Sequence, residues 1–424
     1  MDRSGRLFSF DEGSSNTSHQ ATASNAAPAA PLQNYLNMRG DEVSLKLQEA
    51  ARLDPDFVDV VLAADLYGIP SRALDGIGIK NGDLWRQIYS IGTGLTAEVV
   101  QHTMESDERP ERATPPDKTI ALKIFQSTRL ASPNKTKAAR LKVYDSILKE
   151  MKAFSHPSLS SHPNILKLLF IGWNVHQPYP MLATELGDYG SLDYIIRSWG
   201  PGPTVRQKRN ITIDIALGLQ AIHHAGITHG DLKPDNIIVF SHEDPTRQVV
   251  AKLTDFGGSD ETYVAESFVK PMHFTPLWCA PEVLGKDPDI PWNSADIYSY
   301  GLVVASLWAG PESSGPRSEG KVHEEGYESQ GASVLSGSVS LASDQDIEGL
   351  EYIKNLPENH PDSVMSVLKR RLTRETLPAG IDPGELFAIL NPALRTYWWE
   401  RPDTEELMVL ISNFARTLGR IVEP

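Results

Sequence analysis

The chain has 424 residues, a formal net charge of −15, and 40% hydrophobic and 22% charged residues. This composition is that of an ordinary soluble globular protein, long enough for a sizeable core and more than one domain-sized unit. The acidic balance argues against nucleic acid and anionic membrane surfaces as partners, because both bind clustered Lys and Arg.

Membrane attachment and disulfide bonding are not expected either. The longest apolar run, residues 300–310, ends at Pro311 and falls short of the roughly 20 residues that span a bilayer. The chain begins without an apolar signal segment, Asp2 stands where myristoylation needs glycine, and the last four residues contain no cysteine for prenylation. The single cysteine, Cys279, excludes an internal disulfide and indicates a reducing compartment. We therefore expect an intracellular, cytoplasmic protein, with the nucleus also open.

The first 85 residues carry no recognisable chemistry. Residues 1–33 are rich in Ser, Ala, Asn and Pro. Such a stretch buries too little apolar surface to offset the entropy of ordering it, so we predict a disordered tail. Residues 34–85 are predicted to be a helical extension, because apolar residues recur at helical spacing over 41–66, with an interruption at Asp54 and Pro55.

Two segments with strand character follow. Residues 85–100 read as strand, turn, strand, and the turn contains Gly92 and Gly94. Glycines two apart let a backbone bend closely over a polyphosphate, although most such turns are plain hairpins. Residues 119–125 alternate as a strand does, and they carry Lys123 on the same face as the small residue two positions before it.

The rest of the chain alternates helices and strands up to a low-complexity insertion. A helix is predicted over 135–154, with an apolar stripe through Tyr144 and Met151. Residues 312–346 are rich in Ser, Gly and Glu and are predicted to be a flexible insertion. Further strands are predicted at 166–170, 179–185, 237–240 and 249–253, and further helices at 205–224, at 294–309 and beyond residue 347.

Residues 229–236, with the sequence HGDLKPDN, form the most informative stretch. They lie between an apolar helix and a short apolar strand, so a loop there can direct several side chains to one point. Asp231 could accept a hydrogen bond from an attacking hydroxyl, and Lys233 could neutralise a transferring phosphoryl group. Asn236 offers an amide oxygen, a ligand that suits Mg²⁺. The stretch predicts phosphoryl transfer.

These residues resemble the catalytic loop of the eukaryotic-type protein kinase family, with Gly230 where most members carry Arg. Further motifs follow in family order over residues 86–418: the glycine turn, Ile120-Ala121-Leu122-Lys123, Asp255-Phe256-Gly257, Ala280-Pro281-Glu282 and Trp399-Glu400-Arg401-Pro402-Asp403. Ala97 replaces the third glycine of the turn. The resemblance implies an α+β, bilobal fold. Residues 86–186 would form an N-lobe with a five-stranded antiparallel sheet and one main helix, and residues 187–418 a mostly helical C-lobe.

The resemblance also implies ATP and Mg²⁺ as cofactors and assigns roles to particular residues. Glu150 would pair with Lys123, although its spacing is longer than usual and Asp145 remains an alternative. Thr184 would be the gatekeeper beside a hinge at 185–187. The implied catalytic residues are Asp231, Lys233, Lys123, Glu150 and Thr275; the nucleotide-binding residues are Ile91, Gly92, Gly94, Val99, Ala121, Lys123, Thr184, Glu185, Gly187, Ser191 and Ile238; and the metal ligands are Asn236 and Asp255.

Supporting roles are implied for residues outside the reaction itself. His229 would support the loop as a core histidine, and Asp296 would accept hydrogen bonds from its backbone. Arg401 would pair with Glu282, with an ordinary surface ion pair as the alternative. Cys279 is expected to be a small buried hydrophobe.

Three functions fit these features to different degrees. The leading hypothesis is a serine/threonine protein kinase that acts on a protein substrate. The second is a pseudokinase-type, ATP-binding scaffold, which Gly230, Ala97 and the long spacing of Glu150 favour slightly. A small-molecule kinase is disfavoured by the Lys-Pro-Asp-Asn loop. Gly230 also removes the guanidinium that would bind an activation-segment phosphate, so activity is expected not to depend on such a phosphate. The substrate, pathway, regulators and oligomeric state are not predicted.

Overall fold

The structure is a computed structural model. It describes residues 55–73, 89–93, 97–103, 119–125, 137–173, 179–198, 202–261, 274–285, 291–309, 354–356, 360, 363–379 and 381–418. Several predicted features lie outside the described residues: the tail at 1–33, the helical pattern over 41–54, Gly94, and the insertion at 312–346. Among the described residues, no helix has the length and apolar character needed to cross a membrane.

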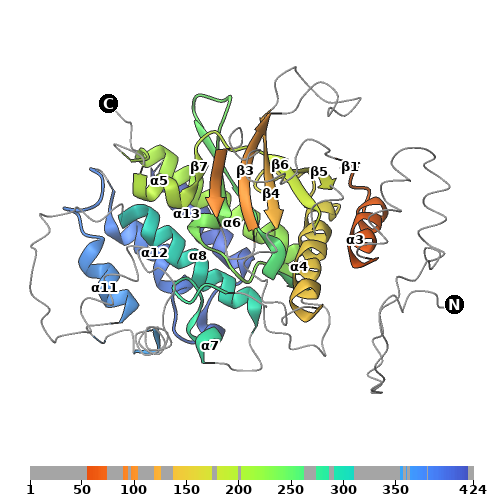
Figure 1. Cartoon of the computed structure of the whole chain (residues 1–424). Helices are drawn as coiled ribbons and strands as arrows, with labels where there is room; N and C mark the ends of the chain where they lie inside the picture. Colours follow the sequence, from red (N-terminus) through yellow and green to blue (C-terminus); the bar gives the residue numbers. More distant parts are fainter. Residues whose placement is uncertain are drawn as a thin grey trace, which may run out of the picture.

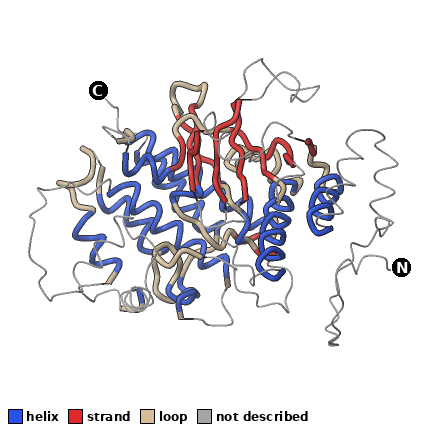
Figure 2. Tube along the Cα trace, viewed as in Figure 1, coloured by secondary structure: helices blue, strands red, loops and turns tan. Residues whose placement is uncertain are grey.

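The described strands of the first lobe form one six-stranded sheet in the order β1-β5-β6-β4-β3-β2. The neighbouring strands from β5 to β2 are antiparallel, whereas β1 runs parallel to β5. The bounds are β1 (Ser71–Ala73), β2 (Tyr89–Thr93), β3 (Ala97–Thr103), β4 (Thr119–Phe125), β5 (Leu168–Trp173) and β6 (Met181–Glu185). The sheet and the helices that flank it are visible in Figures 1 and 2.

Two predictions for this lobe were wrong in detail. The expected five-stranded sheet gains a sixth strand from the extension, which was predicted to be helical only. The strand β1 pairs with the edge of β5, and directly before β1 the carbonyl of Pro70 accepts a hydrogen bond from Ile171 N at 2.8 Å. A short strand of this kind covers an otherwise open edge. The strand β5 also begins later than predicted, because Leu166 N instead donates to Leu253 O at 2.9 Å.

Two helices pack on this sheet. The helix α3 (Pro55–Leu66) begins at the proline that interrupts the apolar pattern, where proline at the first position of a helix is favoured. Its buried residues Val61 and Ala64 belong to the same apolar cluster as Tyr144 and Ile147 of α4 (Lys137–Ser155). Figure 1 shows α3 beside α4. The extension therefore supports the helix that carries Glu150.

The second lobe is mostly helical and is built around α8 (Trp292–Ala309), which is buried on nearly all sides. The helix α6 (Val205–His224) has the predicted bounds, with a capping box at Thr204 and Gly226 in the left-handed conformation after its end. The other helices are α5 (Leu192–Ser198), α7 (Pro281–Leu284), α11 (Val364–Arg371), α12 (Pro383–Ala393) and α13 (Thr404–Leu418). The predicted α+β bilobal architecture is confirmed.

Short strands at the junction carry the candidate site. The strands β9 (Ile237–Ser241) and β10 (Val249–Leu253) form an antiparallel pair, and β7 (Gly190–Ser191) joins β9. The strand β8 (Ile227–Thr228), paired with β11 (Asp260–Glu261), leads into the loop at 229–236. Because β8 ends directly before this loop and β9 begins directly after it, backbone hydrogen bonds fix both ends of the loop.

Candidate active site

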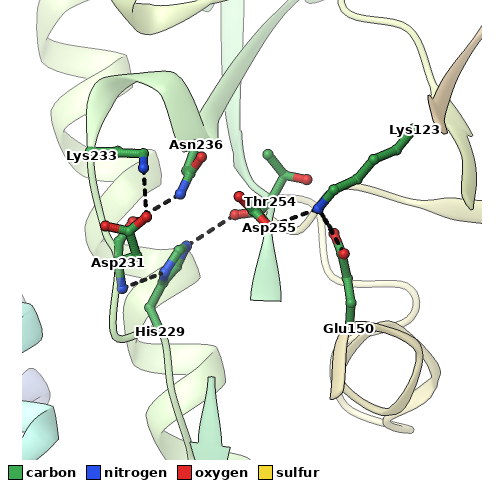
Figure 3. A network of polar contacts seen from close by, with 8 residues as sticks. All are labelled: Lys123, Glu150, His229, Asp231, Lys233, Asn236, Thr254 and Asp255. Atoms are coloured by element: carbon green, nitrogen blue, oxygen red, sulfur yellow. Dashed lines mark hydrogen bonds and ion pairs between the residues drawn. The ribbon is translucent and has the colours of Figure 1, made fainter. Parts of the chain in front are cut away.

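A lysine of the sheet lobe joins two carboxylates from different elements. Lys123 Nζ, on β4, lies 2.8 Å from Glu150 Oε2 on α4 and 2.7 Å from Asp255 Oδ1 in the loop after β10. Figure 3 shows the ammonium between the two acids. Glu150 is therefore the partner of Lys123. The alternative, Asp145, is wrong: its side chain is exposed and pairs with Lys149 of the same helix.

The three charged groups of this cluster shift one another's pKa. Burial by itself would lower the pKa of Lys123, but Asp255 and Glu150 together raise it above its ordinary value. Burial raises the pKa of Glu150 to about 7, against the opposing effect of Lys123. Burial would also raise the pKa of Asp255, but Lys123 and Lys233 lower it to about 2. Asp255 is thus ionised at neutral pH, as a metal ligand must be.

The loop at 229–236 holds a second polar cluster. Lys233 Nζ lies 2.6 Å from Asp231 Oδ2 and donates to Thr275 Oγ1 at 2.8 Å. Thr275 N in turn donates to Asp231 Oδ1 at 2.8 Å. Burial raises the pKa of Asp231, and the charge of Lys233 opposes that shift. Both oxygens of Asp231 are thereby held in place, with the carboxylate fixed between the loop and the segment that contains Thr275.

Asn236 and Asp255 supply the oxygens predicted to bind metal. Asn236 Nδ2 donates to Asp231 O at 2.9 Å, which turns the amide into a fixed orientation. Asp255 has a left-handed backbone with φ of 66°, and 40% of its side chain is exposed, so a ligand can reach it. No group of three or more His, Cys, Asp or Glu that could hold a metal occurs among the described residues. A carboxylate and an amide oxygen still fit Mg²⁺, which keeps several waters and substrate phosphates as ligands.

The loop itself is tied to α8. Asp296 accepts hydrogen bonds from His229 N at 2.8 Å and from Gly230 N at 3.0 Å, as predicted. His223, which belongs to none of the sequence motifs, also forms a hydrogen bond with Asp296 at 2.9 Å. Gly230 has φ of +77°, a conformation that glycine adopts without strain. The glycine therefore suits the backbone of this loop as well as removing a guanidinium.

An aromatic column links α4 to both polar clusters. The fully buried Phe256 contacts Phe154 and His229, with ring centroids 5.2 and 5.4 Å apart. His229 Nε2 also lies 3.1 Å from Thr254 O, and Figure 3 marks this contact with a dashed line. Phe154 was missed in the sequence, although it follows Glu150 by four residues and so shares its helix face. Phe256 therefore packs on the same helix that carries Glu150.

The residues predicted to bind nucleotide come from both lobes. From the sheet lobe, Ala121 is paired in register with Thr184, and Val99 is paired with Lys123. Gly92 lies opposite Val99, and Ile91 beside it is exposed. Among the described residues, a Cβ added at position 92 would come within 4 Å of Val99 alone, at 3.9 Å from its Cβ.

The helical lobe supplies the other side. Ile238 of β9 is paired with Ser191 of β7, and a Cβ at Gly187 would collide with Ile238, so glycine permits this close approach of the hinge. Ser191 Oγ accepts a hydrogen bond from Tyr194 N at 3.2 Å. The side chain of Glu185 pairs with Lys252 of β10 at 2.7 Å, and its backbone N donates to Lys167 O at 3.2 Å, so the predicted adenine contact at Glu185 would fall to its carbonyl.

The pair formed by Arg401 and Glu282 is buried, so the alternative of a surface ion pair is wrong. Arg401 Nη1 and Nη2 donate to Glu282 Oε1 and Oε2 at 2.6 and 2.8 Å. The side chains are 0% and 8% exposed. Arg401 also donates to the carbonyls of Arg395, Thr396 and Ser294. This bidentate pair holds α7, and thereby the segment that follows Thr275.

Comparison with known proteins agrees with these motifs. A family model described as the protein kinase domain matches residues 85–371. The dual specificity testis-specific protein kinase 2 of Rattus norvegicus is 36% identical over 179 residues, which cover 38% of this chain and 27% of the rat protein. The probable serine/threonine-protein kinase gdt9 of Dictyostelium discoideum is 43% identical over 104 residues, which cover 24% of this chain and 6% of that protein. The chain thus spans about a quarter or less of the length of these relatives.

Proposed function

Because this chain belongs to the protein kinase family, we propose that it is an active serine/threonine kinase that transfers the γ-phosphoryl group of ATP to hydroxyls of proteins. The observation that carries the proposal is the position of Asp231. Its two oxygens are held by Lys233 and by the backbone of Thr275, at 2.6 and 2.8 Å. A carboxylate with this support can orient and deprotonate an attacking hydroxyl.

Each residue of the two clusters has a place in this reaction. Asp231 accepts the proton of the substrate hydroxyl. The hydroxyl oxygen bonds to the γ-phosphorus as the bond between that phosphorus and the leaving oxygen of ADP breaks. Lys233 stabilises the negative charge of the transferring group, and Thr275 keeps Lys233 and Asp231 in register. Lys123, oriented by Glu150, binds the α- and β-phosphates. Asp255 and Asn236 would hold Mg²⁺, which when bound neutralises phosphate charge.

The alternative is a scaffold that binds ATP without turnover. A scaffold has no need to hold a base and its lysine in a fixed geometry, yet both are hydrogen-bonded to Thr275. The replacements at Gly230 and Ala97 leave this geometry intact: Gly230 keeps its bond to Asp296, and Ala97 is buried in β3. The contacts of Asp231 therefore favour the enzyme.

Phosphate transfer by the purified chain tests the proposal. We expect the wild type, with ATP and Mg²⁺, to phosphorylate itself or dephosphorylated casein. Analysis of the labelled residues should find phosphoserine and phosphothreonine. Phosphotyrosine would point instead to dual specificity, a property that the name of the rat relative states for that protein. A chain that binds ATP but never transfers phosphate would establish the scaffold.

Independence from activation-segment phosphorylation is a further part of the proposal. Position 230 carries no guanidinium, so a phosphate on the segment has no cation to bind there. Substitution of both Thr262→Ala and Ser267→Ala is expected to leave kcat and KM for casein unchanged. Wild-type protein treated with phosphatase before the assay should behave in the same way. A loss of activity in either preparation would contradict the proposal that catalysis does not depend on activation-segment phosphorylation.

A further inference from the structure

A buried ammonium lies beneath the segment that follows Thr275. Lys354 is 2% exposed, and it is the first residue that the structure describes after α8. In the described part of the chain its Nζ donates to three backbone carbonyls, those of Pro276 at 2.7 Å, Leu277 at 3.1 Å and Cys279 at 2.5 Å. No motif identified in the sequence includes this lysine.

The three carbonyls belong to one turn, residues 275–279, which we call the docking turn. Trp278 N and Cys279 N both donate to Thr275 O, at 2.9 and 3.1 Å, so the turn is wound as at the end of a helix. Its carbonyls point toward Lys354, and a cation at such an end is favourable. The start of the turn is Thr275, which contacts Asp231 and Lys233. The side chain of Lys354 therefore anchors the docking turn beyond Thr275, the residue that contacts the catalytic side chains.

The chemistry of the anchor is specific. A protonated lysine has three N–H donors, which match three carbonyl oxygens, and no shorter or neutral side chain supplies as many. A buried carbonyl that loses its donor costs roughly 1–3 kcal/mol. Burial lowers the pKa of Lys354, and Cys279 and Glu282 oppose that shift, so the contacts with the turn and the nearby Glu282 offset the cost of burying the ammonium.

A neighbouring ring connects this anchor to the other end of the segment. The Tyr298 ring of α8 lies 6.0 Å from Lys354 Nζ and 4.9 Å from the guanidinium carbon of Arg401. Arg401 holds Glu282 directly after the turn. The docking turn is thus fixed at Asp231, at Lys354 and, through Glu282, at Arg401.

We propose that Lys354 is a positioning residue that shapes the docking turn for the protein substrate. This inference rests on the proposed kinase function and deepens it. The turn starts at the residue that holds the catalytic base, so a polypeptide whose hydroxyl reaches Asp231 must pass over it. Among the described residues, Lys354 contacts the docking turn and the Tyr298 ring, and none of these contacts is with the nucleotide side. Its loss should therefore weaken binding of the protein substrate and leave ATP binding alone.

Steady-state kinetics on Lys354→Met separate these effects. With dephosphorylated casein as the substrate, we expect KM for casein to rise at least about fivefold, as the loss of buried hydrogen bonds of this strength implies. KM for ATP should stay at the wild-type value. The matched control is Lys208→Met, because Lys208 is also buried and lies over Trp308 of the same helix α8, but does not contact the docking turn. It should leave both KM values unchanged.

A second variant keeps the test independent of folding. Lys354→Gln retains two N–H donors and replaces Lys354→Met in the test if that variant does not fold. Lys354→Gln should raise KM for casein and leave KM for ATP unchanged. An unchanged KM for casein, or equal rises in both KM values, in a folded variant would overturn the inference and assign Lys354 to stability alone. A wild type that phosphorylates neither casein nor itself would instead overturn the proposed function.

Discussion

Asp231→Asn should abolish nearly all phosphate transfer while leaving nucleotide binding intact. The amide that replaces the carboxylate has no basic oxygen for the hydroxyl proton. Its NH₂ group would also face one of two donors, the Lys233 ammonium or Thr275 N, which lie 2.6 and 2.8 Å from the carboxylate in the wild type. A positioned base contributes roughly 10²–10⁴ in rate, so we expect kcat to fall by about that factor. Affinity for ADP with Mg²⁺, measured by calorimetry, should not change, because Lys123 and Asp255 are untouched.

The matched control for this substitution is Asp235→Asn. Asp235 lies four residues further along the same loop and is exposed, so its loss removes an equal charge without touching the base. It should retain wild-type kcat. An Asp231→Asn protein that still turns over at the wild-type rate would falsify the role of Asp231 and, with it, the proposed mechanism.

The largest effect on stability is expected from Arg401→Met. The substitution leaves Glu282 as a buried carboxylate without its cation, and removal of one partner of a buried pair costs about 3–5 kcal/mol. The carbonyls of Arg395, Thr396 and Ser294 also lose their donor. Urea denaturation followed by circular dichroism should report this loss in the free energy of unfolding, and activity should fall because α7 is no longer held.

Two further variants distinguish a lost pair from general disturbance. In the double variant Arg401→Met with Glu282→Leu the buried charge is absent, and a large part of the stability should return. Arg395→Met removes an arginine from a pair that is 4.0 Å long and 41% and 44% exposed, so a change within about 1 kcal/mol is expected. A double variant no more stable than Arg401→Met would mean that the lost carbonyl contacts, and not the unpaired charge, dominate.

Local patterns in the sequence were sufficient for the elements that carry the motifs. The strand at 119–125, the helix at 205–224 and the strand at 249–253 were predicted with the bounds that the structure has. Their signals lie within each segment: alternation in the strands, and in the helix an apolar period closed by Gly226. The octet around Asp231 is equally local as a motif, since its residues lie within eight positions, although Asp296 and Thr275 from distant segments hold it in place.

Contacts between distant segments decided the rest. The choice of Glu150 over Asp145 depends on which face of α4 is turned toward Lys123. The packing of α4 on the sheet sets that orientation. The pairing of β1 with β5 depends on the open edge of β5. A strand of three residues is too short for its sequence pattern or its spacing to predict this pairing. The burial of Arg401 depends on α8 and on residues more than a hundred positions earlier.

The sequence by itself therefore determined the family of this chain and indicated the chemistry that we propose, because the motifs that carry both are short and lie within single segments. Only the tertiary structure decided how those side chains are held. Lys354 is the clearest case: its acceptors lie 75 to 78 positions earlier in the chain and are backbone carbonyls. Such acceptors are present at every residue, so no residue type marks them in advance.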